Sequence, residues 1–277
     1  MKESTIKNLR LKRLTQEEIK KVQLEVLKEF HDFCMAHSLK YSLCAGTLLG
    51  AIRHKGYIPW DDDIDVMMPR REYLRLLNIY KSDDFTLYHY SRKKSYMITY
   101  AKLCSNKTYV VEGVTYESDY GVDIDIFPLD FFPDTKEESQ KWSDHLGLLK
   151  DIRNVKNIKL SHSRSLWKNI RLAFLHLLAL PIPMHWLVKR VDKVAQKYAY
   201  KTDGFLGNMT NGYRMKERNP MAKGLIDVDF EGHTFKAIDN YDEYLRGLFN
   251  DYMQLPPEDK RKSTHAFKAY WRSACDQ

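Results

Sequence analysis

The sequence predicts an α+β fold, with a mixed sheet core in the first half of the chain and an added helical region in the second. Up to about residue 131, short stretches with strand-like alternation are interspersed with helical patterns. From about residue 136 to 200 the pattern is helical, and a hairpin and a short amphipathic helix follow. The chain has 277 residues and 43% hydrophobic content, enough to bury a substantial core. We expect a core unit over residues 1–135, on which a helical region and C-terminal tail over residues 136–277 pack.

The first half begins with a helix whose start is visible in the sequence. Thr15 and Glu18 have the spacing of a capping box, and apolar residues then recur at helical intervals as far as Phe33. Alternation and glycine positions predict the later elements: a strand over 41–46 that ends at Gly46, helices over 47–55 and 70–82, and strands over 62–68, 84–91, 95–105, 107–112 and from 121 to a stop at Pro128.

The most apolar stretch of the chain covers residues 165–201. It is a poor candidate for a membrane span, because Arg171 interrupts it and Pro181 and Pro183 break it. Lys and Arg cluster on both of its flanks. Two interpretations remain open: a buried helix pair with solvated basic ends, and a helical hairpin over residues 164–197 that makes peripheral contact with a membrane.

The net charge and the cysteine positions limit the classes of binding partner and the cellular compartment that we expect. A net charge of +8 favours anionic partners such as nucleotide phosphates, nucleic acid or an anionic membrane. The basic residues form no recognition helix or aromatic stacking surface, so we expect no nucleic-acid partner. The four cysteines are far apart and include no CxxC pair, which indicates neither a disulfide framework nor a zinc site. Because the first residues contain no apolar signal segment, we expect a cytoplasmic protein, peripheral on the inner face of the cell membrane if the hairpin docks there.

Four carboxylates are crowded into positions 61–65. If this stretch is a strand, alternation places Asp63 and Asp65 on one face, which Asp61 can share, while Asp62 opposes them. Two bare carboxylates about 4 Å apart repel by about 4 kcal/mol at an effective dielectric constant near 20. A divalent cation, Mg²⁺ or Mn²⁺, would compensate this repulsion, and Mg²⁺ prefers oxygen ligands.

A second acidic pair strengthens this interpretation. Asp123 and Asp125 alternate with apolar residues in the same way. Either pair alone is also typical of a solvated strand end, but two such pairs embedded in apolar residues favour a metal site. If the two strands are neighbours, a third carboxylate reaches the same cluster. Two metal ions about 4 Å apart could then bind the attacking and leaving oxygens of a phosphoryl transfer.

A glycine-containing turn and a basic segment lie just before the first acidic stretch. A strand that ends in glycine before a helix start exposes backbone N–H groups that can bind a phosphate. The basic residues could neutralise phosphate oxygens, or they could form a solvated loop. We assign the turn, the basic residues and the first carboxylate to substrate binding: Gly46, Thr47, Gly50, Arg53, His54, Lys55 and Asp61.

Three stretches carry a resemblance to a known family. AGTLLGAIRHKGYIPWDDDIDVMMPRREY, at residues 45–73, resembles the signature of the LicD family, which includes bacterial phosphocholine transferases and, more distantly, fukutin-type sugar-phosphate transferases. IDIFPLD and the tail DEYLRGLFNDYMQLPPEDKR resemble its later motifs. The resemblance extends from about residue 14 to about residue 265. It implies the mixed sheet core of polymerase-β-like nucleotidyltransferases.

The resemblance also implies an activity. Enzymes of this type move an alcohol phosphate from a CDP-activated donor, such as CDP-choline, to a sugar hydroxyl of a surface or lipid-linked glycan, and CMP leaves. The acceptor would be a precursor of teichoic acid, lipopolysaccharide or capsule. The chain has no cysteine cluster like the zinc loop of the fukutin-related members, which favours the bacterial branch.

The resemblance also implies roles for individual residues of this sequence, at the positions that match the family's motifs. The metal ligands become Asp63 and Asp65, with Asp125 as third carboxylate and general base. The family usually has an apolar residue where Asp123 stands, so Asp123 remains an alternative ligand. Lys102 falls where such enzymes often carry a basic residue near the donor.

Other functions stay open. The transferred group could be ribitol phosphate or glycerol phosphate, or the chain could transfer a nucleotide itself. Outside the enzyme class, it could be an inactive, membrane-associated subunit of a glycan assembly complex. The intact set of carboxylates argues against inactivity.

Overall fold

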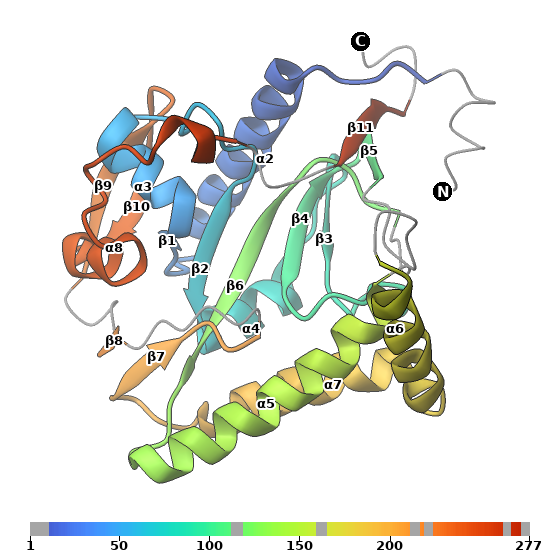
Figure 1. Ribbon diagram of the computed structural model, residues 1–277. Helices are drawn as coiled ribbons and strands as arrows, with labels where there is room; N and C mark the ends of the chain where they lie inside the picture. Colours follow the sequence, from blue (N-terminus) through green and yellow to red (C-terminus); the bar gives the residue numbers. More distant parts are fainter. Residues whose placement is uncertain are drawn as a thin grey trace.

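The computed structural model describes residues 11–111, 119–158, 165–210, 217–218, 224–262 and 267–272, and it confirms the α+β fold with a mixed sheet (Figure 1). The central strands, in spatial order, are β1 (Ser42–Leu43), β2 (Asp65–Pro69), β6 (Asp123–Phe131), β4 (Ala101–Ser105) and β3 (Phe85–Tyr88). β2 runs parallel to β6, whereas the other pairs along this path are antiparallel. β7 (Phe205–Gly207) pairs with the end of β6, and β8 (Glu217–Arg218) pairs with β7.

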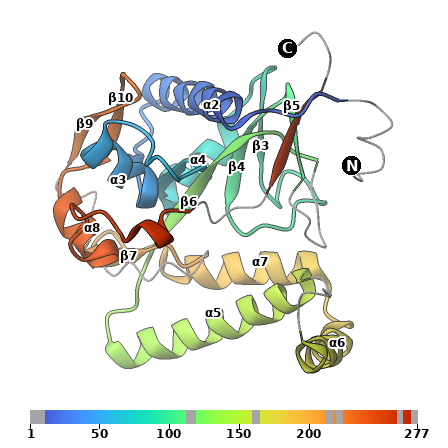
Figure 2. The same ribbon diagram turned by 45° about the horizontal axis from the view of Figure 1, so that its top comes forward.

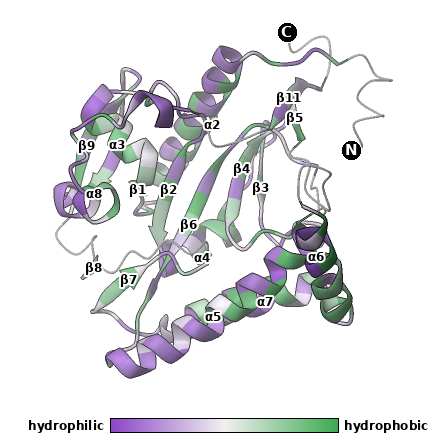
Figure 3. Ribbon diagram, in the orientation of Figure 1, coloured by the Kyte–Doolittle hydropathy of each residue, from purple (hydrophilic) through white to green (hydrophobic). Residues whose placement is uncertain are grey.

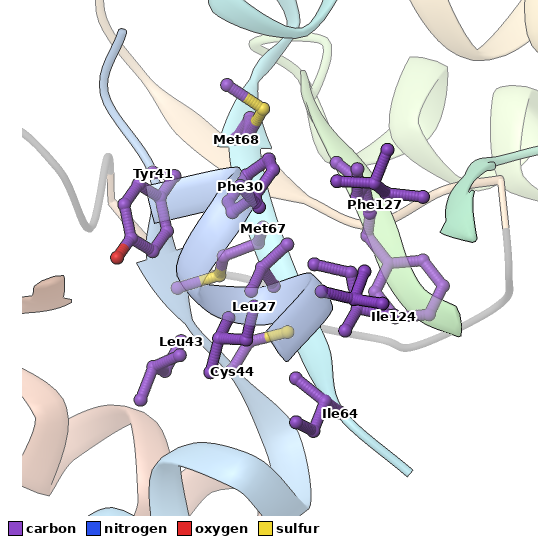
Figure 4. Close-up of a cluster of buried hydrophobic side chains, with 14 of the residues drawn as sticks. Leu27, Phe30, Tyr41, Leu43, Cys44, Ile64, Met67, Met68, Ile124 and Phe127 are labelled. Atoms are coloured by element: carbon purple, nitrogen blue, oxygen red, sulfur yellow. The ribbon is translucent and has the colours of Figure 1, made fainter. Parts of the chain in front are cut away.

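Helix α2 (Gln16–Ala36) packs against the sheet. The capping box is confirmed, since the Glu18 amide donates to Thr15 Oγ1 at 3.2 Å and the Thr15 amide donates to Glu18 Oε2 at 2.7 Å. Leu27 and Phe30 of α2 are fully buried. They belong to the same cluster as three apolar side chains of β2 and β6: Met67, Ile124 and Phe127 (Figure 4). α3 (Ala45–His54) follows β1, and α4 (Arg70–Ile79) follows β2 directly.

The end of the chain returns to this core. The predicted hairpin and helix are confirmed as β9 (Leu225–Phe230), β10 (His233–Ile238) and α8 (Tyr241–Phe249), and η2 (Glu258–Lys260) follows them. β11 (Lys268–Trp271) pairs with β5 (Thr108–Val111). The Ala45 amide donates to the Tyr244 hydroxyl at 2.9 Å, which joins the start of α3 to α8. Residues more than 190 positions apart thus form one wall of the core.

A helical layer lies along one end of the sheet (Figures 1 and 2). It consists of α5 (Lys136–Asn157), α6 (Leu166–Ala179), α7 (Met184–Ala195) and the short η1 (Gln196–Tyr198). α5 and α7 share a second hydrophobic cluster around Trp142, Leu146 and Leu187. A buried ion-pair network links this layer to the sheet: Arg70, directly after β2, donates to Asp130 of β6 at 2.6 and 2.7 Å and to Asp192 of α7 at 2.8 Å.

The expectation that Pro128 stops the last core strand is wrong, because β6 continues to Phe131. The Asp125 amide donates to the Ile64 carbonyl on the β2 side. Amides alternate sides along a strand, so position 128 faces the β4 side. The pairing of β4 with β6 ends at Ala101, opposite Ile126, so the missing donor of Pro128 breaks no ladder hydrogen bond.

Several other strands are shorter than predicted, β1 and β3 among them, and one helix starts earlier. β4 begins at residue 101 rather than 95, and α3 begins at Ala45, before Gly46. β2 begins at Asp65, so residues 62–64 precede the strand. The Asp62 carbonyl instead accepts a hydrogen bond from Gln23 Nε2 at 2.9 Å. Strand alternation therefore does not place Asp63 beside Asp65, because Asp63 precedes the strand.

Candidate active site

Three neighbouring strands bring charged side chains into one row. Asp65 of β2 is the register partner of Asp125 of β6, and Asp125 is the register partner of Lys102 of β4. Register partners place their side chains on the same face of a sheet, and residues two apart on a strand share a face. Asp123 therefore lies on this face as well. The two acidic stretches of the sequence are neighbours in the structure.

Lys102 provides a positive charge within this row. Its ammonium Nζ lies 2.6 Å from Asp123 Oδ2 and 2.5 Å from Asp125 Oδ1. Burial opposes the charged form of Lys102, but the two carboxylates outweigh burial and raise its pKa. The family resemblance implies a donor-binding role for Lys102. The structure shows it bound to the carboxylates of β6, a partnership that only the strand pairing creates.

Asp65 sits in an environment that disfavours its negative charge. Burial, followed by the neighbouring carboxylates Asp63, Asp125 and Asp61, raises the pKa of Asp65 well above its ordinary value. Its backbone amide donates to Thr47 Oγ1 at 2.8 Å, which fixes the start of β2. A bound cation would relieve this unfavourable electrostatic environment.

The carboxylates fit a metal ion by their chemistry. Asp61, Asp62 and Asp63 place ligand oxygens within 4.8 Å of one another, and they form the one cluster of three metal-binding side chains found in the described part of the chain. Such hard oxygen ligands suit Mg²⁺ or Mn²⁺. This cluster differs from the predicted ligand set of Asp63, Asp65, Asp125 and Asp123. It includes Asp62, which strand alternation had placed on the opposite face, because residues 61–64 precede β2.

A cleft of about 740 Å³ opens beside the carboxylates. One wall contains Gly46, Trp60, Asp61, Asp63 and Asp65. The opposite wall comes from the end of α8 and the segment after it, residues 249–262. Asp63 also lines a second, smaller pocket with Asp123, Asp125 and Lys102. Asp63 thus lies between the large cleft and the charged row on β6 and β4.

Comparisons with known proteins agree with this architecture. The family model LicD/FKTN/FKRP, nucleotidyltransferase domain, matches residues 38–168. The Haemophilus influenzae protein named lipopolysaccharide cholinephosphotransferase LicD is 32% identical over 272 residues, which cover 94% of this chain and 99% of that protein. The chain belongs to the LicD family. An uncharacterized protein of Rickettsia typhi is also similar, at 30% identity over 46% of this chain and 41% of its own length.

The signature turn of this LicD-family chain packs tightly on the acidic segment. A Cβ atom on Gly46 would lie 2.4 Å from Asp61 Oδ2, so glycine allows the carboxylate to approach the helix start. Thr47 is buried, and its hydroxyl accepts the hydrogen bond from the Asp65 amide. Thr47 therefore positions β2. Gly50 packs against the loop after α3, where a Cβ atom would lie 2.4 Å from the Gly56 carbonyl oxygen.

The basic residues assigned to substrate binding diverge in the structure. Arg53 lines the cleft, and its guanidinium donates to the carbonyl oxygens of Tyr252 and Gln254 on the opposite wall. His54 and Lys55 are not among the residues that line the cleft. Lys55 is exposed and ends α3 in the left-handed conformation, with φ of 58°.

The cleft wall formed by residues 249–262 was absent from the predicted site. It includes two exposed basic side chains, Lys260 and Lys262. The Arg261 guanidinium lies 5.7 Å from the centre of the Trp60 ring, across from the acidic wall. The one sequence signal for this wall is the resemblance of the tail motif to the family, because spacing alone cannot relate residue 260 to residue 60.

Replacing Gly50 by Ala is expected to lower the free energy of unfolding by about 1–3 kcal/mol, because the new methyl group meets backbone that cannot rotate away. Gly147→Ala is the matched control. It lies in α5, where an added Cβ meets nothing within 4 Å, so alanine should raise stability by about 0.5–1 kcal/mol. Denaturant unfolding measures both. Equal effects of the two changes would show that the approach of Gly50 to Gly56 is not required.

Proposed function

We propose that this chain transfers phosphocholine from CDP-choline to a sugar hydroxyl of a cell-surface glycan or its lipid-linked precursor, and releases CMP. The full-length similarity to a lipopolysaccharide cholinephosphotransferase supports the substrate class. The observation that carries the proposal is the apposition of the acidic segments of β2 and β6 beside a large cleft. A volume of about 740 Å³ suits a nucleotide-sized ligand.

The walls of the cleft match the two ends of the donor. Lys260, Lys262 and Arg53 can neutralise the diphosphate. Trp60 and Phe249 line the same cleft, and a quaternary ammonium group binds well over an aromatic face. Arg261 already places a cation near the Trp60 ring. These aromatic side chains favour choline over the uncharged polyols ribitol and glycerol.

The reaction forms one bond to phosphorus and breaks another. The acceptor oxygen attacks the phosphorus that carries choline, its proton passes to Asp125, and the bond to CMP breaks. Lys102 orients Asp125 through the contact between Nζ and Oδ1. When bound by Asp63 and its neighbouring carboxylates, Mg²⁺ or Mn²⁺ would stabilise negative charge on the phosphates. Most of the rate enhancement then comes from positioning and charge neutralisation.

A donor screen tests the proposal. The protein is incubated with Mg²⁺, a glycan acceptor and, separately, CDP-choline, CDP-ribitol, CDP-glycerol or CTP. We expect CMP release to be fastest with CDP-choline. Faster release from a CDP-polyol would reassign the alcohol, and pyrophosphate release from CTP would indicate nucleotidyl transfer. No product from any donor would support an inactive subunit.

The two walls should have separable effects on the donor. Lys260→Gln combined with Lys262→Gln is expected to raise KM about tenfold for every CDP donor, since the diphosphate is common to all of them. Trp60→Leu should raise KM about tenfold for CDP-choline alone, because only choline carries a cation. Lys136→Gln, an exposed lysine on α5, is the control. Initial rates across donor concentrations give these values. An equal effect of Trp60→Leu on CDP-choline and CDP-glycerol would contradict the placement of choline.

A further inference from the structure

Helix α6 lies at the edge of the helical layer (Figure 2), and most of its residues are hydrophobic (Figure 3). Only Leu172 and Ala179 of this helix are buried. Trp167 is 80% exposed, and the other large apolar side chains that are about half exposed or more are Leu166, Ile170, Phe174, Leu177 and Leu178. Exposed apolar side chains concentrated on one helix mark an interaction surface.

These side chains form one continuous face. Leu166, Ile170, Phe174 and Leu177 follow at intervals of four, four and three residues, the spacing of a single helical stripe. Trp167 and Leu178 widen the stripe. We call these six residues the α6 apolar face. A stripe with this spacing normally packs on a core, but here it points away from one.

The adjacent helix α7 behaves differently. Leu187, Val188 and Val191 are fully buried, and Asp192 pairs with Arg70. No single described helix meets the length and hydropathy of a membrane span, although α6 and the segment Met184–Tyr198 meet them as a pair bent by 82°. The sequence left open whether this region is a buried helix pair or a hairpin in contact with a membrane. Burial in the core describes α7, whereas the exposed apolar side chains of α6 fit contact with a membrane.

The segment of the sequence that contains α6 carries charged side chains of a single sign. Residues 152–191 contain eight Lys and Arg and no Asp or Glu, so this segment carries the entire +8 net charge and the rest of the chain is neutral. Within α6, Lys168 and Arg171 are exposed. Trp186 of α7 adds a second exposed tryptophan, whose side chain is half exposed. Basic residues and tryptophans beside an apolar stripe are typical of a helix that lies in a membrane interface.

We propose that α6 lies in the plane of an anionic lipid bilayer, with the α6 apolar face among the acyl chains and its basic residues at the headgroup phosphates. A second copy of the chain fits less well, because self-association would bring like charges together around the face. An anionic bilayer offers both an apolar interior and opposite charge. This inference does not depend on the reaction that the cleft carries out.

Co-sedimentation with vesicles tests the inference. We expect the intact chain to pellet at low salt with vesicles of equal parts phosphatidylglycerol and phosphatidylcholine, and to bind pure phosphatidylcholine far more weakly. Trp167→Ser, Phe174→Ser and Leu177→Ser combined should lower the partition coefficient about a hundredfold. Lys168→Gln with Arg171→Gln should lower it about thirtyfold, and added salt should shrink this difference.

Controls separate the membrane from other occupants. Met35→Ser with Ile79→Ser changes exposed apolar residues outside the helical layer and should leave vesicle binding unchanged. Circular dichroism melting checks that the α6 variant is folded. The inference is overturned if the intact chain stays in the supernatant, if the folded α6 variant binds vesicles as tightly as the intact chain, or if the α6 changes only convert a dimer to a monomer in sedimentation equilibrium.

Discussion

Replacing Asp65 by Asn is expected to lower the rate of CMP release by at least about a thousandfold, while the free energy of unfolding stays the same or rises. Asp65 is buried, and burial and three nearby carboxylates raise its pKa. A neutral amide of the same shape removes that repulsion and keeps the backbone bond to Thr47. It also removes a charged group from the row shared with Asp125, on which phosphate neutralisation is proposed to depend.

Two measurements on the same protein separate catalysis from folding. CMP release from the best donor gives the rate, and thermal unfolding with and without Mg²⁺ gives stability. Mg²⁺ should raise the melting temperature of the intact chain more than that of Asp65→Asn. Asp227→Asn, an exposed strand carboxylate paired with Lys236, is the control and should change neither the rate nor the response to Mg²⁺. Near-normal turnover by Asp65→Asn would remove Asp65 from the site, and loss of activity with a large fall in stability would indicate a structural role instead.

Arg70→Met is expected to lower the free energy of unfolding by about 3–5 kcal/mol, because it leaves two buried carboxylates without their cation. The side chains of Arg70, Asp130 and Asp192 are each 3% exposed or less. Burial opposes the charged form of Arg70, but Asp130 and Asp192 outweigh burial and raise its pKa. The Arg70 guanidinium therefore stays charged, and its ion pairs with Asp130 and Asp192 join the sheet to the helical layer.

The control lies on the same helix. Arg75 pairs with Glu72 at 2.8 Å but is 53% exposed, so Arg75→Met should cost less than about 1 kcal/mol. Adding Asp130→Asn and Asp192→Asn to Arg70→Met should regain part of the lost stability, since the cost comes from uncompensated charge. Urea unfolding of all the variants measures this. A cost of Arg70→Met no larger than that of Arg75→Met would show that the buried network does not hold the helical layer on the sheet.

Patterns in the sequence correctly predicted the elements that are determined by interactions between residues close together in the chain. The capping box at Thr15 and the hairpin of β9 and β10 depend on neighbours a few residues away. Pro128 was misjudged because its effect depends on which strand lies on its N–H side. Contacts between residues far apart in the sequence, made by strand pairing or by the C-terminal segment packing on the core, were not predicted either. These include the contact of Lys102 with Asp125 and the cleft wall over residues 249–262.

The Arg70–Asp130 pair has a consequence for the alignment of the acidic strands. The parallel ladder runs from Asp65 opposite Asp125 to Pro69 opposite Leu129, so the ion pair forms its next rung. A slip of one residue between the strands would turn one aspartate toward the opposite side of the sheet and separate the guanidinium from its partner. A one-residue slip of β2 against β6 would therefore disrupt contacts at both ends of the ladder. The Arg70–Asp130 ion pair, at the end away from the cleft, thus helps to fix the register that aligns Asp65 with Asp125.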